Sequence, residues 1–209
     1  MKTTLGFYLI CFVFFCNQDL MAQLTVANGG TLGMTPAQLV QNWLVGPGVI
    51  ISNVTYNGSS AIITSNQVGS FNATGGAMTQ LGLDAGLIMT NGTASIAIGP
   101  NNSSGAGYNT NGPGDPDLTI LAGGVTYDKA VIEFDFVSLA DTVKFNYAFG
   151  SEEFYEFCYQ FNDAFGFFLS GPGITGPFFK QQHEHRPDAG LFQPRNDQQH
   201  MRKPFIRVG

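Results

Sequence analysis

The stretch "AVIEFDFVSLADTVKFNYAF", residues 130 to 149, alternates apolar and polar side chains in two runs that are separated by "SLAD". Successive side chains of an extended strand point to opposite faces, so each run has one apolar face and one polar face. The predicted core face consists of Ile132, Phe134, Phe136, Val143, Phe145 and Tyr147. The predicted polar face consists of Glu133, Asp135, Lys144 and Asn146. The short link predicts a hairpin, so we expect strands 130–137 and 142–149 to be antiparallel neighbours.

Outward from this pair, the chain consists of short apolar segments separated by Gly, Asn and Pro, a pattern typical of strands and turns. We expect four further strands, at 49–56, 60–65, 86–90 and 164–170. The segment "MTPAQLVQNWLVGPG" predicts one helix, because Thr35 can cap it, Pro36 suits its first turn and Gly46 ends it. The sequence therefore predicts an all-β fold, an antiparallel β-sandwich of jelly-roll type with one short N-terminal helix.

The first 22 residues have the order of charge and hydropathy that is typical of a secretory signal peptide. Lys2 precedes an apolar run at residues 5 to 16, which is shorter than the about 20 residues that span a bilayer. Cleavage after Ala22 would leave Cys158 as the only cysteine, which excludes an intramolecular disulfide. An uncleaved anchor is the alternative. We expect a secreted, extracellular or cell-surface protein without a transmembrane segment in its mature chain.

Charge is distributed unevenly along the sequence. Residues 23 to 178 contain two basic and eleven acidic residues, a net charge of −9, whereas residues 179 to 209 contain six basic and three acidic residues, a net charge of +3. A region so poor in Lys and Arg cannot hold phosphates, which argues against nucleic acid and anionic membranes as partners. It suits cations, or neutral polymers such as glycans.

Five acids are candidate ligands for a cation, and Ca²⁺ is the cation that their chemistry predicts. Calcium takes about six to eight oxygen ligands, which loops between strands can supply together. In "FGSEEF", residues 149 to 154, two carboxylates lie within an aromatic stretch, where an inward-turned carboxylate needs a cation or backbone N–H donors. The alternative is that the acids cap turns and face water. The candidate ligands are Asp115, Asp117, Glu152, Glu153 and Asp163.

The loop at residues 99 to 124 contains too much Gly, Asn and Pro for regular structure before Leu118. Such a long loop in a small domain is usually functional, ion-bound or mobile, and a plain flexible excursion is the alternative.

Three stretches taken together resemble a known family: "GLDAGLIMTNG" at 82 to 92, the segment from "GDPDL" to "GSEEFYEF" at 114 to 157, and "FNDAFGFFLSGPGI" at 161 to 174. They are similar to the choice-of-anchor L domain of bacterial surface and secreted proteins, over residues 39 to 177. The resemblance implies a secreted or surface-displayed bacterial protein, often with a sorting or anchoring module after the domain. It implies no catalytic residues.

The resemblance ends after Pro177, where the sequence becomes rich in Gln, His, Arg and Pro. A disordered tail is one explanation, and a frameshifted or truncated gene is the other. We expect a signal peptide at 1–22, an incomplete β domain at 23–178 and an aberrant tail at 179–209. This tail is expected to add no strand, which would leave the domain truncated at its C-terminal side.

Two classes of function remain. The favoured class is a surface adhesion module without catalytic activity, whose partner is a surface glycan or another cell-surface protein. All three histidines lie in residues 179 to 209, which excludes a Ser-His-Asp triad from residues 23 to 178. The alternative is a secreted carbohydrate-active hydrolase that uses a carboxylate pair, for which Glu133 and Glu152 are candidates.

Overall fold

The computed structural model describes residues 23–74, 81–100, 103, 107, 109–150, 163–172, 190–192 and 204–208. The predicted signal peptide, Glu152, Glu153 and Cys158 lie outside these residues. The described strands pair antiparallel throughout, which confirms the all-β class, with few short helices. The sandwich and jelly-roll details stay a prediction.

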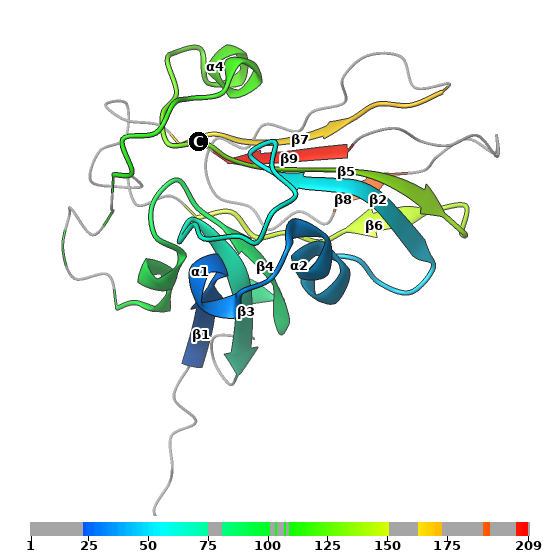
Figure 1. Ribbon diagram of the computed structural model, residues 1–209, viewed down its shortest axis with the longest axis horizontal. Helices are drawn as coiled ribbons and strands as arrows, with labels where there is room; N and C mark the ends of the chain where they lie inside the picture. Colours follow the sequence, from blue (N-terminus) through cyan, green and yellow to red (C-terminus); the bar gives the residue numbers. More distant parts are fainter. Residues whose placement is uncertain are drawn as a thin grey trace, which may run out of the picture.

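The strands of the described residues form three sheets (Figure 1). A three-stranded sheet has the order β1-β3-β4, with β1 at Gln23–Asn28, β3 at Val68–Thr74 and β4 at Ala85–Met89. A four-stranded sheet has the order β2-β5-β9-β7, with β2 at Val49–Tyr56, β5 at Ala130–Ser138, β9 at Pro204–Val208 and β7 at Phe165–Leu169. A two-stranded sheet pairs β6 at Val143–Phe145 with β8 at Gly190–Phe192.

The main core lies on one face of the four-stranded sheet. Figure 1 shows the strands of this sheet in the upper half of the molecule, with β1, β3 and β4 below them and α2 beside these strands. The core side chains come from α2, β2, β3, β5 and β7, and include Leu39, Val40, Val54, Val68, Ile132, Phe134, Phe136 and Leu169. The hydrophobic face of the four-stranded sheet is thereby removed from water together with the hydrophobic faces of α2 and β3.

The two faces that alternation assigns to β5 and β6 are confirmed. Phe134 and Phe136 are buried, whereas Glu133 and Asp135 on the other face are half-buried. In the segment that contains β6, the predicted core residues are half-buried and the predicted polar residues are exposed.

The predicted pairing of these two strands is wrong. The neighbours of β5 are β2 and β9, and β6 pairs with β8 in another sheet. The side chain of Phe145 stacks on Phe167 of β7, with 4.8 Å between ring centroids. Alternation gives the same two faces whether strands are neighbours in one sheet or face each other across a core, so the pattern could not separate these arrangements.

The strands predicted at 49–56, 86–90 and 164–170 are confirmed as β2, β4 and β7, within a residue or so at each end. The strand predicted at 60–65 is wrong. After β2 the chain turns at Asn57 and Gly58, both with positive φ, and the Ile63 N–H donates to the Met34 carbonyl. Ile63 is buried beside α1, so its apolar character serves packing without a strand.

The predicted N-terminal helix is confirmed as α2 (Pro36–Trp43), with a capping box between Thr35 and Gln38. It is not the only helix, because the structure also has α1 (Gly29–Leu32), the 3-10 helix η1 (Ala94–Ile98) and α4 (Pro116–Ala122). The signal for α4 was present, since Asp115 and Pro116 repeat the cap-and-proline order of Thr35 and Pro36. Within the described part of the chain, no helix has the length and hydropathy to cross a membrane.

The expectation that residues 179 to 209 add no strand is wrong. They contain β8 and β9, and β9 lies between β5 and β7, where Ile206 is opposite both Ile132 and Phe167. The segment "PFIRV" has enough β-forming residues to pair on both sides. A frameshifted or truncated gene stays a prediction.

We predict that Phe136→Ala lowers the free energy of unfolding by about 3 to 5 kcal/mol, because the ring is 5% exposed and its removal leaves a cavity. The control is Leu139→Ala, at the first residue after the strand and 73% exposed, which should change the free energy of unfolding by less than about 0.5 kcal/mol. Urea titrations followed by circular dichroism measure both. Equal, small losses would contradict the placement of this face in the core.

Candidate functional site

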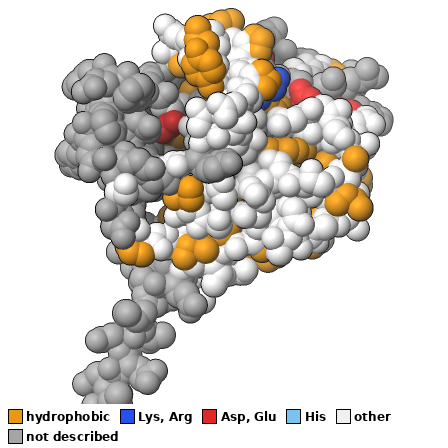
Figure 2. All heavy atoms as spheres, turned by 60° about the vertical axis from the view of Figure 1, so that its left-hand side comes forward, with side chains coloured by type: hydrophobic (Ala, Val, Ile, Leu, Met, Phe, Trp, Pro, Cys, Tyr) orange, Lys and Arg blue, Asp and Glu red, His pale blue; other side chains and the backbone are white. Residues whose placement is uncertain are grey.

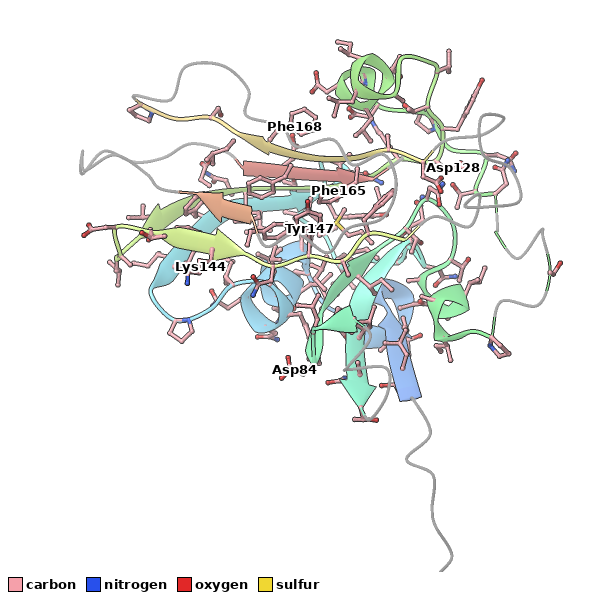
Figure 3. The ribbon with its side chains drawn as sticks, turned by 180° about the vertical axis from the view of Figure 1, so that it is seen from behind. Asp84, Asp128, Lys144, Tyr147, Phe165 and Phe168 are labelled. Atoms are coloured by element: carbon pink, nitrogen blue, oxygen red, sulfur yellow. The ribbon has the colours of Figure 1, made fainter. Side chains whose placement is uncertain are left out.

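Several loops converge at the end of the molecule that carries α4. Figure 3 shows Asp128 toward this end and Lys144 toward the opposite end. The helix α4 lies on β7, with Leu118 and Leu121 packed against Ala164 and Phe168 in a small second core. The side chains that hold the loops together are mostly polar.

Asp128 fixes the loop that precedes α4. Its buried carboxylate accepts hydrogen bonds from the Thr110 hydroxyl at 2.7 Å, the Thr110 N–H at 3.3 Å and the Gly112 N–H. The Asp128 N–H in turn donates to the Gly112 carbonyl at 3.2 Å. The described part of the long loop, from residue 109 onward, is therefore anchored to residue 128.

Gln67 connects three segments that are distant in the sequence. Its buried side chain donates to the carbonyl oxygens of Asp128 at 2.7 Å and Asn91 at 3.2 Å, and accepts from the Tyr56 hydroxyl at 3.4 Å. The Tyr56 hydroxyl also forms a hydrogen bond with the Ser65 hydroxyl, at 3.0 Å. Burial raises the pKa of the Tyr56 hydroxyl, an effect that this hydrogen bond opposes, so the group stays protonated at neutral pH.

Sequence reasoning did not find Gln67 or Asp128. A buried glutamine carries no local signal, because its three partners are set by the fold. Asp128 follows a turn-rich segment, where an acid is usually exposed.

Asp115, a predicted cation ligand, caps α4. Its Oδ1 accepts from the Asp117 N–H at 3.0 Å and the Leu118 N–H at 3.2 Å, and the residue is buried. Asp117 lies in the first turn of the same helix, where a negative charge interacts favourably with the helix dipole. Asp115 thus serves as a cap, as in the alternative to metal binding, but it is buried and does not face water.

Asp163 lies two residues before β7. Its Oδ1 accepts from the Asn91 side-chain amide at 2.8 Å, which ties β7 to the loop after β4. Glu152 and Glu153, the remaining predicted ligands, are outside the described residues. Within the described ranges, no three His, Cys, Asp or Glu side chains form a group that could hold a metal ion.

The predicted carboxylate pair of a hydrolase is only half described. Glu133 is half-buried on the outer face of β5, and Glu152 is outside the described residues. On the same face, Asp135 accepts from the Asn53 side-chain amide at 2.6 Å, and Asn53 has a positive φ at the irregularity in β2. The Glu133 and Glu152 pair stays a prediction.

One comparison with known proteins gave a match. The family model of the Choice-of-anchor L domain matches residues 26–183, a range that contains Gln67, Asp115, Asp128 and Asp163. No curated protein matches, and no solved structure matches.

We predict that Asp128→Gly accelerates amide hydrogen exchange at Thr110 and Gly112 by about tenfold or more. Glycine tolerates the positive φ of this position, so the variant removes the carboxylate without straining the backbone, and each lost bond to a charged acceptor is worth about 1.5 to 3 kcal/mol. The control is Asp141→Gly in the exposed loop before β6. Exchange at both amides that stays at the wild-type rate would show that Asp128 does not anchor the loop.

Proposed function

The chain belongs to the choice-of-anchor L domain family, and from this premise we propose that it is a glycan-binding adhesion module without catalytic activity. Membership of the family indicates a secreted or cell-surface bacterial protein. Adhesion, the glycan as partner and the lack of catalysis are our proposal.

The observation that carries this proposal is the role of Asp115 and Asp128, the two buried carboxylates among the described residues. Asp115 accepts two backbone N–H groups of α4, and Asp128 accepts from the backbone and side chain of the loop before α4. A carboxylate held this way stabilises a loop and is poorly placed to exchange protons with a substrate. Loops that are ordered before a ligand arrives lower the entropic cost of binding, which favours a recognition surface.

Charge supports a neutral glycan as the partner. Residues 23 to 178 carry a net charge of −9 and have only Lys129 and Lys144 as cations. Anionic polymers would be repelled by such a domain. Neutral sugars are not repelled, and their hydroxyl groups can donate hydrogen bonds to carboxylates and carbonyl oxygens.

We predict that the full chain binds immobilised neutral glycans on an array and releases no chromophore from chromogenic glycosides. Both assays use the same purified preparation, and a catalytically active glycosidase serves as the positive control for hydrolysis. Hydrolysis would contradict the proposal and favour the carboxylate-pair hydrolase. Absence of binding to every glycan would contradict it as well.

Calcium binding is a second proposal, for a site made from Asp115, Asp117, Glu152, Glu153 and Asp163. The packing of α4 on β7 supports this proposal, because Leu118 and Ala164 lie in one hydrophobic cluster. Leu118 directly follows Asp117, and Ala164 directly follows Asp163. Because Asp115 and Asp163 already accept hydrogen bonds through Oδ1, the proposed site depends on the two glutamates.

We predict that millimolar Ca²⁺ raises the melting temperature relative to EDTA, because a ligand that binds only the native state stabilises it with concentration. Mg²⁺ at the same concentration controls for ionic strength. Identical melting curves in Ca²⁺ and EDTA would remove the calcium proposal and leave the glycan proposal standing.

A further inference from the structure

The segment that follows α4 has its apolar side chains outside and its polar side chains inside. In "VTYD", residues 125 to 128, Val125 is 72% exposed and Tyr127 is 66% exposed, whereas Thr126 is 6% exposed and Asp128 is 8% exposed. A shift of one residue would reverse this assignment and bury the apolar side chains instead. Burial of apolar area is the main stabilising term in folding, so this orientation does not serve the core.

Hydrogen bonds hold the segment in this orientation. The Thr126 hydroxyl accepts from the Asp115 N–H at 3.1 Å and lies 3.2 Å from the Asp115 carbonyl and 3.0 Å from the Thr119 hydroxyl. The Asp128 carboxylate accepts a hydrogen bond from the Thr110 hydroxyl in the loop before α4, and the Asp128 carbonyl oxygen accepts one from the Gln67 side-chain amide. Tyr127 also forms an antiparallel bridge with Pro113. The backbone under the two exposed side chains is therefore fixed on both sides.

A third large apolar side chain is exposed on α4. Ile120 is 78% exposed, next to Thr119, the residue through which the helix contacts Thr126. Figure 2 shows hydrophobic side chains gathered at the top of the molecule, over the region of α4. We call Ile120, Val125 and Tyr127 the α4 patch.

We propose that the α4 patch binds a neutral glycan, with a pyranose ring stacked on Tyr127; this inference rests on the proposed function. A pyranose has an apolar face of C–H groups and a rim of hydroxyls, and an exposed Tyr ring complements such a face. Val125 and Ile120 are the other exposed large apolar side chains of α4 and the segment that follows it. The buried polar network beneath them sets the position of the ring before the sugar arrives.

The size and charge of the patch favour this occupant over a protein. A stable protein interface buries about 800 Å² on each partner, which three side chains do not supply, whereas one or two sugar rings need far less. Residues 115 to 129 contain three acids, with Asp115 at the N-cap of α4, Asp117 in its first turn and Asp128 after it, against the single cation Lys129. Charge complementarity therefore excludes an anionic sugar from this position.

The test compares variants of the full chain by biolayer interferometry on immobilised oligosaccharides. The probes are neutral glucose, mannose, galactose and N-acetylglucosamine oligomers, with oligogalacturonate as the anionic probe. We expect Tyr127→Ser to weaken binding of the neutral ligand about tenfold or more, as loss of a central aromatic contact does. Val125→Ser should weaken it less, and Tyr127→Phe, which keeps the ring, should stay within about twofold of the wild type.

The matched control is Leu139→Ser, which removes an equally exposed apolar side chain in the loop between β5 and β6. Melting temperatures check that each variant is folded, and the comparison of Tyr127→Phe with Tyr127→Ser gives a readout that a general loss of stability would not produce. Neutral-glycan binding that survives both serine variants would overturn the α4 patch and leave the proposed function intact. Preferential binding of oligogalacturonate would also overturn it. If the wild type binds no probe, the patch and the proposed function both fail.

Discussion

The apolar face of β5 is the surface on which the other layers of this protein are assembled. Ile132, Phe134 and Phe136 alternate with Glu133 and Asp135, so one face of the strand is apolar from Ala130 to Phe136. The strands β2 and β9 pair with its two edges, and α2 packs in the same core. Because the side-chain period is two, a slip of one residue would turn all three apolar side chains to the outside, which fixes the register of the sheet.

The loop end of the molecule is held mainly by polar groups. Beside the small apolar core between α4 and β7, the buried side chains of Gln67, Asp115 and Asp128 each satisfy backbone N–H or C=O groups that would otherwise lose their partners. Burying such groups is tolerated only when they are hydrogen-bonded. The consequence is a set of loops whose shape is fixed by specific bonds, with exposed apolar side chains such as Val125 and Tyr127 held on the outside.

This division of roles bears on the acids of the domain. A strongly acidic sequence favoured cation binding, but the position of each acid in the fold determines what its oxygens contact. Asp115 caps a helix, Asp128 closes a loop and Asp163 accepts from Asn91, so each of these three holds a segment in place. The excess of negative charge still acts at longer range, where it selects against anionic partners.

The sequence by itself determined which faces of β5 and β6 are apolar, where α2 begins, and the family to which the chain belongs, because alternation, the Thr35 cap and short motifs are local signals. Only the tertiary structure decided which strands are neighbours, since β5 and β6 have the same alternation whether they pair or face each other. It also decided the role of Gln67, whose partners Tyr56 and Asp128 lie 11 and 61 positions away. It decided as well that Tyr127 is exposed, because the hydrogen bonds of Thr126 and Asp128 to other segments turn those two polar side chains inward.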